Sequence, residues 1–326
     1  MFPQHTPSDS IKKICFCGLP LFQSVKTSTG KVISFLGIPF YSRTISEAHT
    51  VRYRFLFIRW KKINHHERYQ TLVRKIDERY QTLVGKTDER YQTLLGKNNE
   101  RYYSLVDTIN ELLWAANLQS VTANPTWLKD KAFAPGRWAL GYPALYALYR
   151  ILNEAKPKRI LELGLGQSTR MIGQYAVAFE GVEHTVVEHD PEWIDFFQKD
   201  FALSDRSRIV QLDKENVQYK DAKDVCAFAC FADTFANQKF DFICVDAPFG
   251  SEGYSRIDVL KLLPDCLTED FIILFDDTNR GGEMHTLEEI ATVLKKAGIA
   301  HHLGHYAGDK MTSVICSASR KFFASM

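Results

Sequence analysis

Residues 159–169 read Arg-Ile-Leu-Glu-Leu-Gly-Leu-Gly-Gln-Ser-Thr, an apolar run that ends in closely spaced glycines and small hydroxyl residues. This order predicts a buried strand, a tight turn and then a helix. Gly164 and Gly166 permit a positive φ and a close approach of backbone to a ligand. Ser168 or Thr169 then caps the helix, whose free N–H groups favour a polar or anionic group. The stretch therefore predicts an α/β domain that binds a nucleotide-like cofactor.

Acidic residues end the later apolar runs. Four such runs follow, namely 184–188 ending in Glu188, 208–213 ending in Asp213, 240–246 ending in Asp246, and 271–277 ending in Asp276 and Asp277. The carboxyl ends of parallel strands face the ligand crevice of such a sheet, so we expect these acids to line it. Glu188 comes 22 residues after Gly166, the placement that suits hydrogen bonds to ribose hydroxyls. Asp213 is a candidate for the adenine amino group, and a helix cap or surface acid is the alternative.

The stretch Glu162-x-Gly164-x-Gly166-x-x-Thr169 resembles motif I of the class I S-adenosylmethionine (SAM) methyltransferases. The resemblance implies a Rossmann-like domain with a seven-stranded sheet over 125–326, closed by an antiparallel pair. It also implies that Glu162 and the two glycines hold the amino-acid end of SAM. The sequence departs from the motif at Ser168, where the family's loop has a third glycine. The candidate cofactor-binding residues are Glu162, Gly164, Gly166, Ser168, Thr169, Glu188 and Asp213.

Asp246, Asp276 and Asp277 together resemble the metal triad of cation-dependent O-methyltransferases. That resemblance implies an all-oxygen site for Mg²⁺ or Mn²⁺, which lowers the pKa of the acceptor hydroxyl. It departs from the family at Asp277, where Asn is common. If no metal binds, Asp246 is the candidate general base for a sugar hydroxyl. His302 and its neighbours His301 and His305 are the substitutes for that catalytic role.

Residues just before the first strand are further candidates for the site. Arg137, Trp138 and Tyr142 stand where many methyltransferases place residues that close over cofactor or substrate. Simple packing in the core is the alternative.

The N-terminal part is basic and contains a duplication. Residues 1–66 carry ten Lys or Arg against two acidic residues, a net charge of +8, whereas the whole chain carries +2. An anionic surface such as lipid or acidic glycan is a better partner for this part than nucleic acid, and a solvated basic face is the alternative. The pattern Ile-x-Phe-x-Gly-x-Pro begins at Ile14 and again at Ile33, which predicts a β-hairpin-like module over 1–50. It is similar to the N-terminal tag of bacterial enzymes that build or decorate surface polysaccharides. A basic, aromatic linker is expected over 51–66, with membrane-interface contact and a plain amphipathic strand or helix as alternatives.

An eleven-residue repeat follows, with copies that begin at Glu67, Glu78, Glu89 and Glu100. Tyr, Leu and Val recur on one helical face, so the repeat predicts a coiled-coil stalk over 67–113. Eleven residues over three turns give about 3.67 residues per turn, which favours a straight or right-handed bundle. The ring of Tyr at the start of each copy fits poorly in a two-stranded seam. We therefore expect a homo-oligomer, a trimer or tetramer.

The chain is expected to be cytoplasmic, with peripheral contact at the inner face of the membrane through its basic N-terminus. No stretch approaches the ~18 to 20 apolar residues that span a bilayer, and seven scattered cysteines fit a reducing compartment. The resemblances to known families together imply a SAM-dependent O-methyltransferase that acts on a sugar hydroxyl of a bacterial surface polysaccharide or its precursor. An NAD(P)-dependent Rossmann oxidoreductase and a non-catalytic coiled-coil scaffold with a degenerate methyltransferase fold are the alternatives.

Overall fold

The computed structural model describes residues 10–16, 19–27, 30–35, 38–45, 50–55, 58–59, 63–136 and 138–326. Within the first 66 residues, side chains are described only at 23–26, 30–35 and 42–44. The chain divides into two compact units, Met1–Asn98 and Asn99–Met326.

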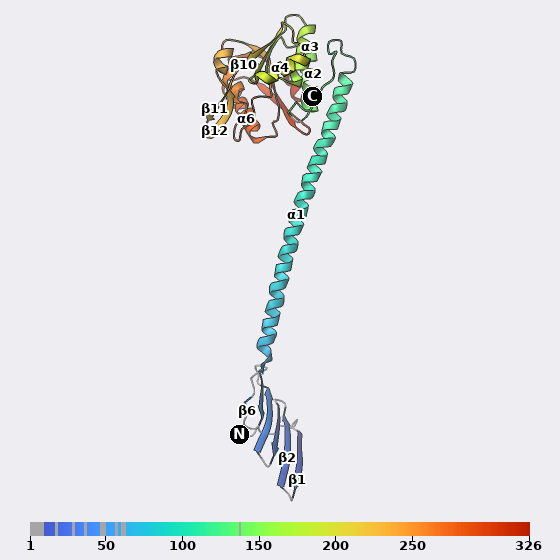
Figure 1. Cartoon of the computed structure of the whole chain (residues 1–326), viewed down its shortest axis with the longest axis vertical. Coiled ribbons are helices and arrows are strands. Elements are labelled where there is room, and N and C mark those ends of the chain that lie inside the picture. Colours follow the sequence, from blue (N-terminus) through green and yellow to red (C-terminus); the bar gives the residue numbers. More distant parts are fainter. Residues whose placement is uncertain are drawn as a thin grey trace. The chain divides into compact units, whose positions relative to one another are not determined.

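The first unit contains an antiparallel sheet larger than the expected hairpin (Figure 1). Its strands are β1 (Ser10–Phe16), β2 (Leu19–Thr27), β3 (Gly30–Phe35), β4 (Ile38–Ile45), β5 (Thr50–Phe55), β6 (Ile58–Arg59) and β7 (Ile63–Asn64). They run in the order β1-β2-β3-β4-β5-β6, with β7 beside β5. Of the alternatives for 51–66, the described residues show strands, because β5, β6 and β7 lie within 50–64. A two-stranded hairpin is marginal alone, and further paired strands supply what it lacks.

The sequence duplication is also a structural duplication. The register of β1 on β2 shifts between Ile14 and Cys15, and that of β3 on β4 shifts between Ile33 and Ser34. In both hairpins the residue after the shift pairs with the proline of the motif, Pro20 or Pro39. The two glycines of the motif lie outside the described residues.

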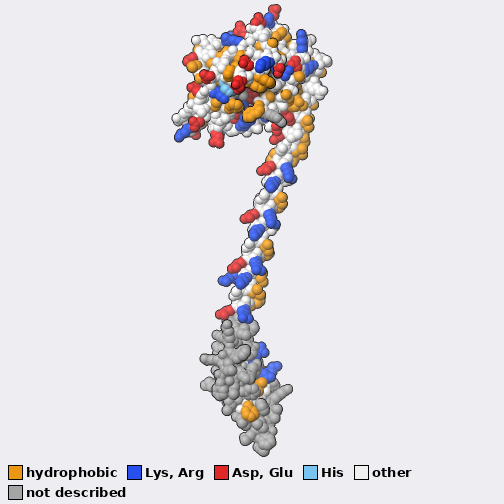
Figure 2. All heavy atoms as spheres, viewed as in Figure 1, with side chains coloured by type: hydrophobic (Ala, Val, Ile, Leu, Met, Phe, Trp, Pro, Cys, Tyr) orange, Lys and Arg blue, Asp and Glu red, His pale blue; other side chains and the backbone are white. Residues whose placement is uncertain are grey.

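Helix α1 (His65–Val121) is a single helix of 57 residues that contains the whole eleven-residue repeat. Its Tyr and Leu side chains remain exposed; for example, Tyr80 is 63% exposed and Leu83 is 64% exposed. Figure 2 shows apolar side chains recurring along one side of the helix, among Lys, Arg, Asp and Glu. The helix is as predicted but extends beyond 67–113 at both ends. No helix among the described residues is long and apolar enough to cross a membrane.

The second unit is built on the predicted seven-stranded sheet. Its strands are β8 (Arg159–Leu163), β9 (Glu183–Glu188), β10 (Ser207–Gln211), β13 (Phe240–Val245), β14 (Leu267–Phe275), β15 (His301–Ala307) and β16 (Met311–Ser317). They run in the order β10-β9-β8-β13-β14-β16-β15, and β16 alone runs antiparallel to its neighbours. The chain leaves β8 toward β9 on one side and returns to β13 on the other. This reversal is the switch point at which open α/β sheets bind ligands, and the Rossmann-like fold class is confirmed.

Helices cover both faces of this sheet. They are α2 (Tyr142–Arg150), the π-helix η1 (Ile151–Ala155), α3 (Gln167–Ala178), α4 (Pro191–Asp200), α5 (Phe231–Phe235), η2 (Ile257–Leu262), α6 (Gly281–Lys296) and η3 (Ala318–Ala324). Ile160 packs in one core with residues of α2 and α3, and the next residue, Leu161, packs in the other with residues of α5 and α6. A small hairpin of β11 (Lys214–Tyr219) and β12 (Ala222–Phe228) follows β10.

The end of α1 belongs to the second unit. Trp114 donates its indole N–H to the Ala307 carbonyl at 2.9 Å, and Leu118 is buried in the core. Glu111 accepts the backbone N–H groups of Tyr142 at 2.6 Å and Asp309 at 3.0 Å. The catalytic domain predicted to begin at 125 therefore begins earlier, inside the helix.

Candidate cofactor and acceptor site

The glycine turn after β8 has the shape that the sequence predicts. Gly164 has φ +103°, and a Cβ there would lie 3.1 Å from the Cβ of Ala247. Its N–H donates to the Val187 carbonyl at 2.9 Å, which ties the turn to β9. Gly166 is extended, and no heavy atom lies within 4 Å of the position that a Cβ would take. The turn is thus closed on the sheet side at Gly164 and open at Gly166.

Gly166 is the N-cap residue of the helix that follows, and Thr169 lies in the first turn of that helix. The hydroxyl oxygen of Thr169 accepts the backbone N–H of Gly166 at 2.9 Å, in a capping arrangement at the start of α3. Neither Ser168 nor Thr169 is therefore the N-cap residue that the sequence predicts, although Thr169 makes this bond to Gly166. Ser168 lies buried beside Thr169 in the first turn.

Glu188 joins the end of β9 to the glycine turn. One carboxylate oxygen accepts the backbone N–H of Leu165 at 3.2 Å, and the other accepts those of His189 at 2.7 Å and Asp190 at 3.0 Å. Asp190 in turn caps α4. Backbone donors thus hold this carboxylate in one orientation at the switch point, beside the open side of the turn.

Glu162 is anchored to the neighbouring strand by one of its two carboxylate oxygens. Its side chain is fully buried, and one oxygen lies 2.9 Å from Nε2 of His184 on the neighbouring strand. His184 also forms a hydrogen bond with Ser207 on β10, in which Nδ1 of His184 lies 3.1 Å from the hydroxyl oxygen. The second oxygen of Glu162 is buried without a hydrogen-bond partner. This chain of polar groups connects three strands beneath the turn and leaves one acceptor free there.

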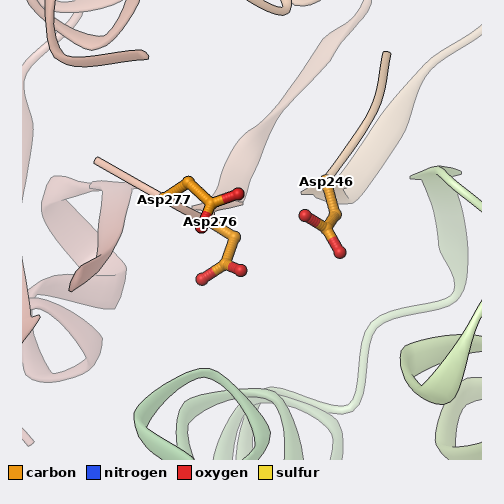
Figure 3. Close-up of side chains that lie close together, drawn as sticks. All are labelled: Asp246, Asp276 and Asp277. Carbon is orange, nitrogen blue, oxygen red and sulfur yellow. The ribbon is translucent and has the colours of Figure 1, made fainter. Parts of the chain in front are cut away.

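The three aspartates after β13 and β14 come together as predicted. One oxygen from each of Asp246, Asp276 and Asp277 lies within 4.8 Å of the others. Figure 3 shows Asp246 across from the other two, at the ends of adjacent strands. Asp276 and Asp277 are buried, whereas the side chain of Asp246 keeps 16% of its surface exposed. Asp246 is therefore the member of the triad that a ligand in the crevice can reach.

Cationic side chains surround these carboxylates. The guanidinium of Arg256 lies 3.2 Å from Asp246 and 2.7 Å from Asp277, and it donates to the Asp276 carbonyl at 2.9 Å. The Lys310 ammonium lies 3.3 Å from Asp277 and 3.7 Å from Asp276, and Arg280 lies 3.1 Å from Asp277. Thr312 donates its hydroxyl to Asp276. The triad is the acidic half of a buried ion-pair cluster.

This environment gives the three carboxyl groups different pKa values. Burial raises the pKa of Asp246 to about 8, against the opposing effect of Arg256 and with the help of the other two aspartates. Burial and the charge of Asp277 raise the pKa of Asp276. Burial also disfavours the charged form of Asp277, but Arg256, Lys310 and Arg280 outweigh it and hold that pKa below its usual value. Asp277 is thus the fixed anion, and Asp246 is the group poised to exchange a proton near neutral pH.

His302 is not part of this site, and its predicted catalytic role is wrong. It pairs with Cys316 near the start of β15, whereas the other end of β15, at Ala307, pairs with Met311 at the edge that carries the aspartates. Five residues of strand separate the two ends, about 16 Å at the usual rise. The late strand pair was correctly predicted, but its direction places His302 at the opposite edge of the sheet.

Asp213 lies just beyond β10, at the same edge of the sheet as Glu188, because Gln211 pairs with Glu188. Its side chain is exposed. Contact with adenine stays a prediction for this residue.

Exposed aromatic rings lie close to the loop that carries Asp246. Trp138 is 84% exposed, and its ring meets that of Phe249 edge to face, with centroids 6.0 Å apart. Lys214 lies over the Phe249 ring at 4.7 Å, and His189 packs near it. Of the other two candidates before the first strand, Tyr142 begins α2 and Arg137 lies outside the described residues. Large exposed aromatic side chains near a crevice suit contact with a ligand.

The sequence analysis missed Arg256, Lys310 and Phe249. Arg256 follows a loop without periodic pattern and has φ +56°, and Lys310 sits in the turn between β15 and β16. No spacing in the sequence relates either residue to the aspartates. These cations can be found only once the fold shows which side chains are buried near the strand ends.

No protein-family model and no curated protein matches this chain. Among solved structures, it is similar to a methyltransferase of Podospora anserina bound to S-adenosylhomocysteine (SAH), with 18% identity over 62% of this chain and 86% of that chain, at a TM-score of 0.37. It is also similar to an O-methyltransferase of Bacillus cereus in complex with SAH, with 11% identity over 67% of this chain and 96% of that one, at a TM-score of 0.39. Likenesses at this level carry no functional argument.

Proposed function

We propose that the chain is a SAM-dependent O-methyltransferase that acts on a sugar hydroxyl of a bacterial surface polysaccharide or its precursor. The observation that carries this proposal is the combination of an open glycine turn, an oriented Glu188 and a proton-exchanging Asp246 at one switch point. The first two suit the binding of a nucleoside, and the third suits deprotonation of a hydroxyl.

The residues around the turn fit SAM. The open space at Gly166 admits a ligand against the backbone, and Glu188 presents an acceptor for ribose hydroxyls. Glu162 keeps a free oxygen that suits an ammonium group, because a buried acceptor without a partner is costly. Bound SAM would supply a methyl group activated for direct transfer to oxygen.

The chain's own contribution to chemistry is positioning and removal of a proton. Asp246 is the reachable carboxylate, and its pKa of about 8 lies near that of an efficient general base at neutral pH. It would accept the proton of the sugar hydroxyl as the oxygen forms its bond to the methyl carbon. Asp276 is fully buried and hydrogen-bonded to Thr312, so it supports Asp246 and does not meet the acceptor.

Two features favour a sugar as acceptor. Trp138 and Phe249 offer aromatic faces near Asp246, and sugar rings present apolar C–H faces to such side chains. The duplicated N-terminal motif, whose two copies form matching hairpins, is similar to the tag of surface-polysaccharide enzymes. The basic charge of this N-terminal part suits contact with an anionic membrane surface.

We further propose that the protein assembles as a trimer or tetramer through α1. The apolar residues of the repeat are exposed along the helix, and soluble proteins rarely leave such a long stripe uncovered. Identical helices in parallel register would cover it with matching Tyr and Leu side chains. Light scattering tests this proposal, and a monomer at micromolar concentration would contradict it.

Calorimetric titration of the full-length protein with SAM and, separately, with NAD tests the cofactor. We expect SAM to bind and NAD not to bind. Binding of NAD alone would favour the oxidoreductase alternative, and binding of neither would favour a scaffold. Mass spectrometry of candidate sugar acceptors incubated with enzyme and SAM then tests for a gain of one methyl group.

A further inference from the structure

The guanidinium of Arg256 bridges one oxygen of Asp246 and one oxygen of Asp277, a position that a shared metal ion would also use. Its Nη2 atom lies 3.2 Å from an oxygen of Asp246 and 2.7 Å from an oxygen of Asp277. A divalent ion shared by the same carboxylates would lie about 2.0 to 2.6 Å from each oxygen. The ion and the guanidinium cannot share that position, both because they overlap and because they carry charge of the same sign.

The fold holds Arg256 firmly in place. The residue is only 3% exposed, and Nη1 donates to the backbone carbonyl of Asp276 at 2.9 Å. Its backbone takes the left-handed conformation, with φ +56°, at the residue that precedes η2. A non-glycine residue in this region is uncommon, so the surrounding structure must favour it. Removing the guanidinium from the cluster would also leave buried carboxylates without a neighbouring cation, which is costly.

The charge of the cluster also argues against a bound divalent ion. Among the described residues, the cluster contains four carboxyl groups, those of Asp246, Asp276, Asp277 and Glu283, and three cations, those of Arg256, Arg280 and Lys310. Its formal charge is −1 with every group ionised and 0 with Asp246 protonated, so an added divalent ion would give it a net charge of +1 or +2. Arg256 and Lys310 thus supply positive charge beside the carboxylates, although Oδ2 of Asp276 and Oδ1 of Asp277 accept no hydrogen bond.

We infer that Arg256 takes the place of the divalent cation and that the aspartate cluster binds neither Mg²⁺ nor Mn²⁺. The residues do not fit the metal that the sequence resemblance implied. Arg256 acts here as a positioning residue: it holds the carboxylate of Asp246 toward the crevice while Lys310 and Arg280 balance Asp276 and Asp277. Only the role given to Asp246 rests on the proposed function, and the cation exchange itself does not.

The test is a Mn²⁺ titration of the full-length protein followed by electron paramagnetic resonance, without SAM or acceptor. We expect the wild type to bind no Mn²⁺ at the aspartate cluster. Any Mn²⁺ signal of the wild type should therefore be unchanged in Asp246→Asn. Arg256→Ala should create such a site, with affinity at least about tenfold above the wild type, since it leaves close carboxylates without their cation. The double variant Arg256→Ala with Asp246→Asn should lose the new site.

Arg280→Ala is the matched control. Arg280 also contacts Asp277, but its side chain is 50% exposed and it does not reach Asp246. This variant should gain no Mn²⁺ site. Circular dichroism checks that each variant is folded, and Arg256→Gln replaces Arg256→Ala if the latter is not.

Two results would overturn the inference. One is a wild-type protein that binds Mn²⁺ in a manner abolished by Asp246→Asn. The other is a folded Arg256 variant that still binds no Mn²⁺, which would show that the arginine is not what excludes the ion. Neither readout depends on methyl transfer, so a failure of the proposed function is seen separately, in the SAM titration.

Discussion

Replacement of Glu188 by Gln tests the cofactor site most directly. The carboxylate accepts three backbone N–H groups, two on one oxygen and one on the other. A glutamine amide offers one acceptor oxygen and one NH₂ group, so in either orientation a donor faces a donor. The variant also loses the negative charge available to ribose hydroxyls.

The expected magnitude follows from these contacts. A hydrogen bond to a charged group contributes about 1.5 to 3 kcal/mol, and 1.4 kcal/mol corresponds to a factor of ten in affinity. We therefore expect Glu188→Gln to weaken SAM binding by at least about tenfold. Isothermal titration calorimetry measures the change, and a thermal melt reports any loosening of the glycine turn.

Glu183→Gln is the control for this experiment. Glu183 lies on the same strand, β9, at its opposite end, and its side chain is exposed. The control should bind SAM like the wild type. If Glu188→Gln also kept wild-type affinity, the assignment of the ribose site to the end of β9 would be refuted.

Four further predictions concern the rest of the chain. Glu162→Ala should weaken SAM binding by tenfold or more and also lower the melting temperature, since it leaves His184 buried beside a gap; calorimetry and a thermal melt separate the two effects. Turnover should rise with pH through about 8, because Asp246 must lose its proton to act as base, and Asp246→Asn should abolish turnover in the same assay. Between the unfolded pKa of Asp246 near 4 and its folded pKa near 8, the native state binds this proton more tightly than the unfolded state does. As the pH rises from 4 to 8, the free energy of unfolding of the wild type relative to Asp246→Asn should therefore fall, and thermal melts at several pH values measure the change. Deletion of 67–110 should give a monomeric or weakly associated protein that still binds SAM, measured by light scattering and calorimetry.

Residues that follow strands were predictable, because a strand is readable from its apolar pattern and its end is then known. Parallel order brings such ends to one edge, which is why Glu188, Asp246 and Asp276 were placed correctly without a structure. Which acid faces the crevice was not predictable. Glu162 is two residues from the glycine turn, yet its side chain is directed to His184 on the next strand.

Predictions failed where strand direction or loop conformation decides the outcome. His302 and His305 look equivalent in the sequence, but only the later part of β15 approaches the edge with the aspartates. Arg256 reaches three aspartates from a loop in which its own φ is positive. Neither apolar periodicity nor residue spacing predicts this loop conformation. The loop conformation nevertheless determines the charge of the site, because it brings Arg256 to the aspartates.

The end of α1, beyond the last copy of the repeat, is connected to the site through one side chain. Glu111 holds the backbone of Asp309, and the next residue, Lys310, reaches the buried carboxylates of Asp276 and Asp277. A Cβ at Gly308 would lie 2.1 Å from a carboxylate oxygen of Glu111, so the turn and the helix fit closely. The composition of the chain places the domain boundary near 125, but these contacts place it before Glu111. The last turns of the helix are thus part of the framework that positions Lys310, whereas the repeats before them are free to serve assembly.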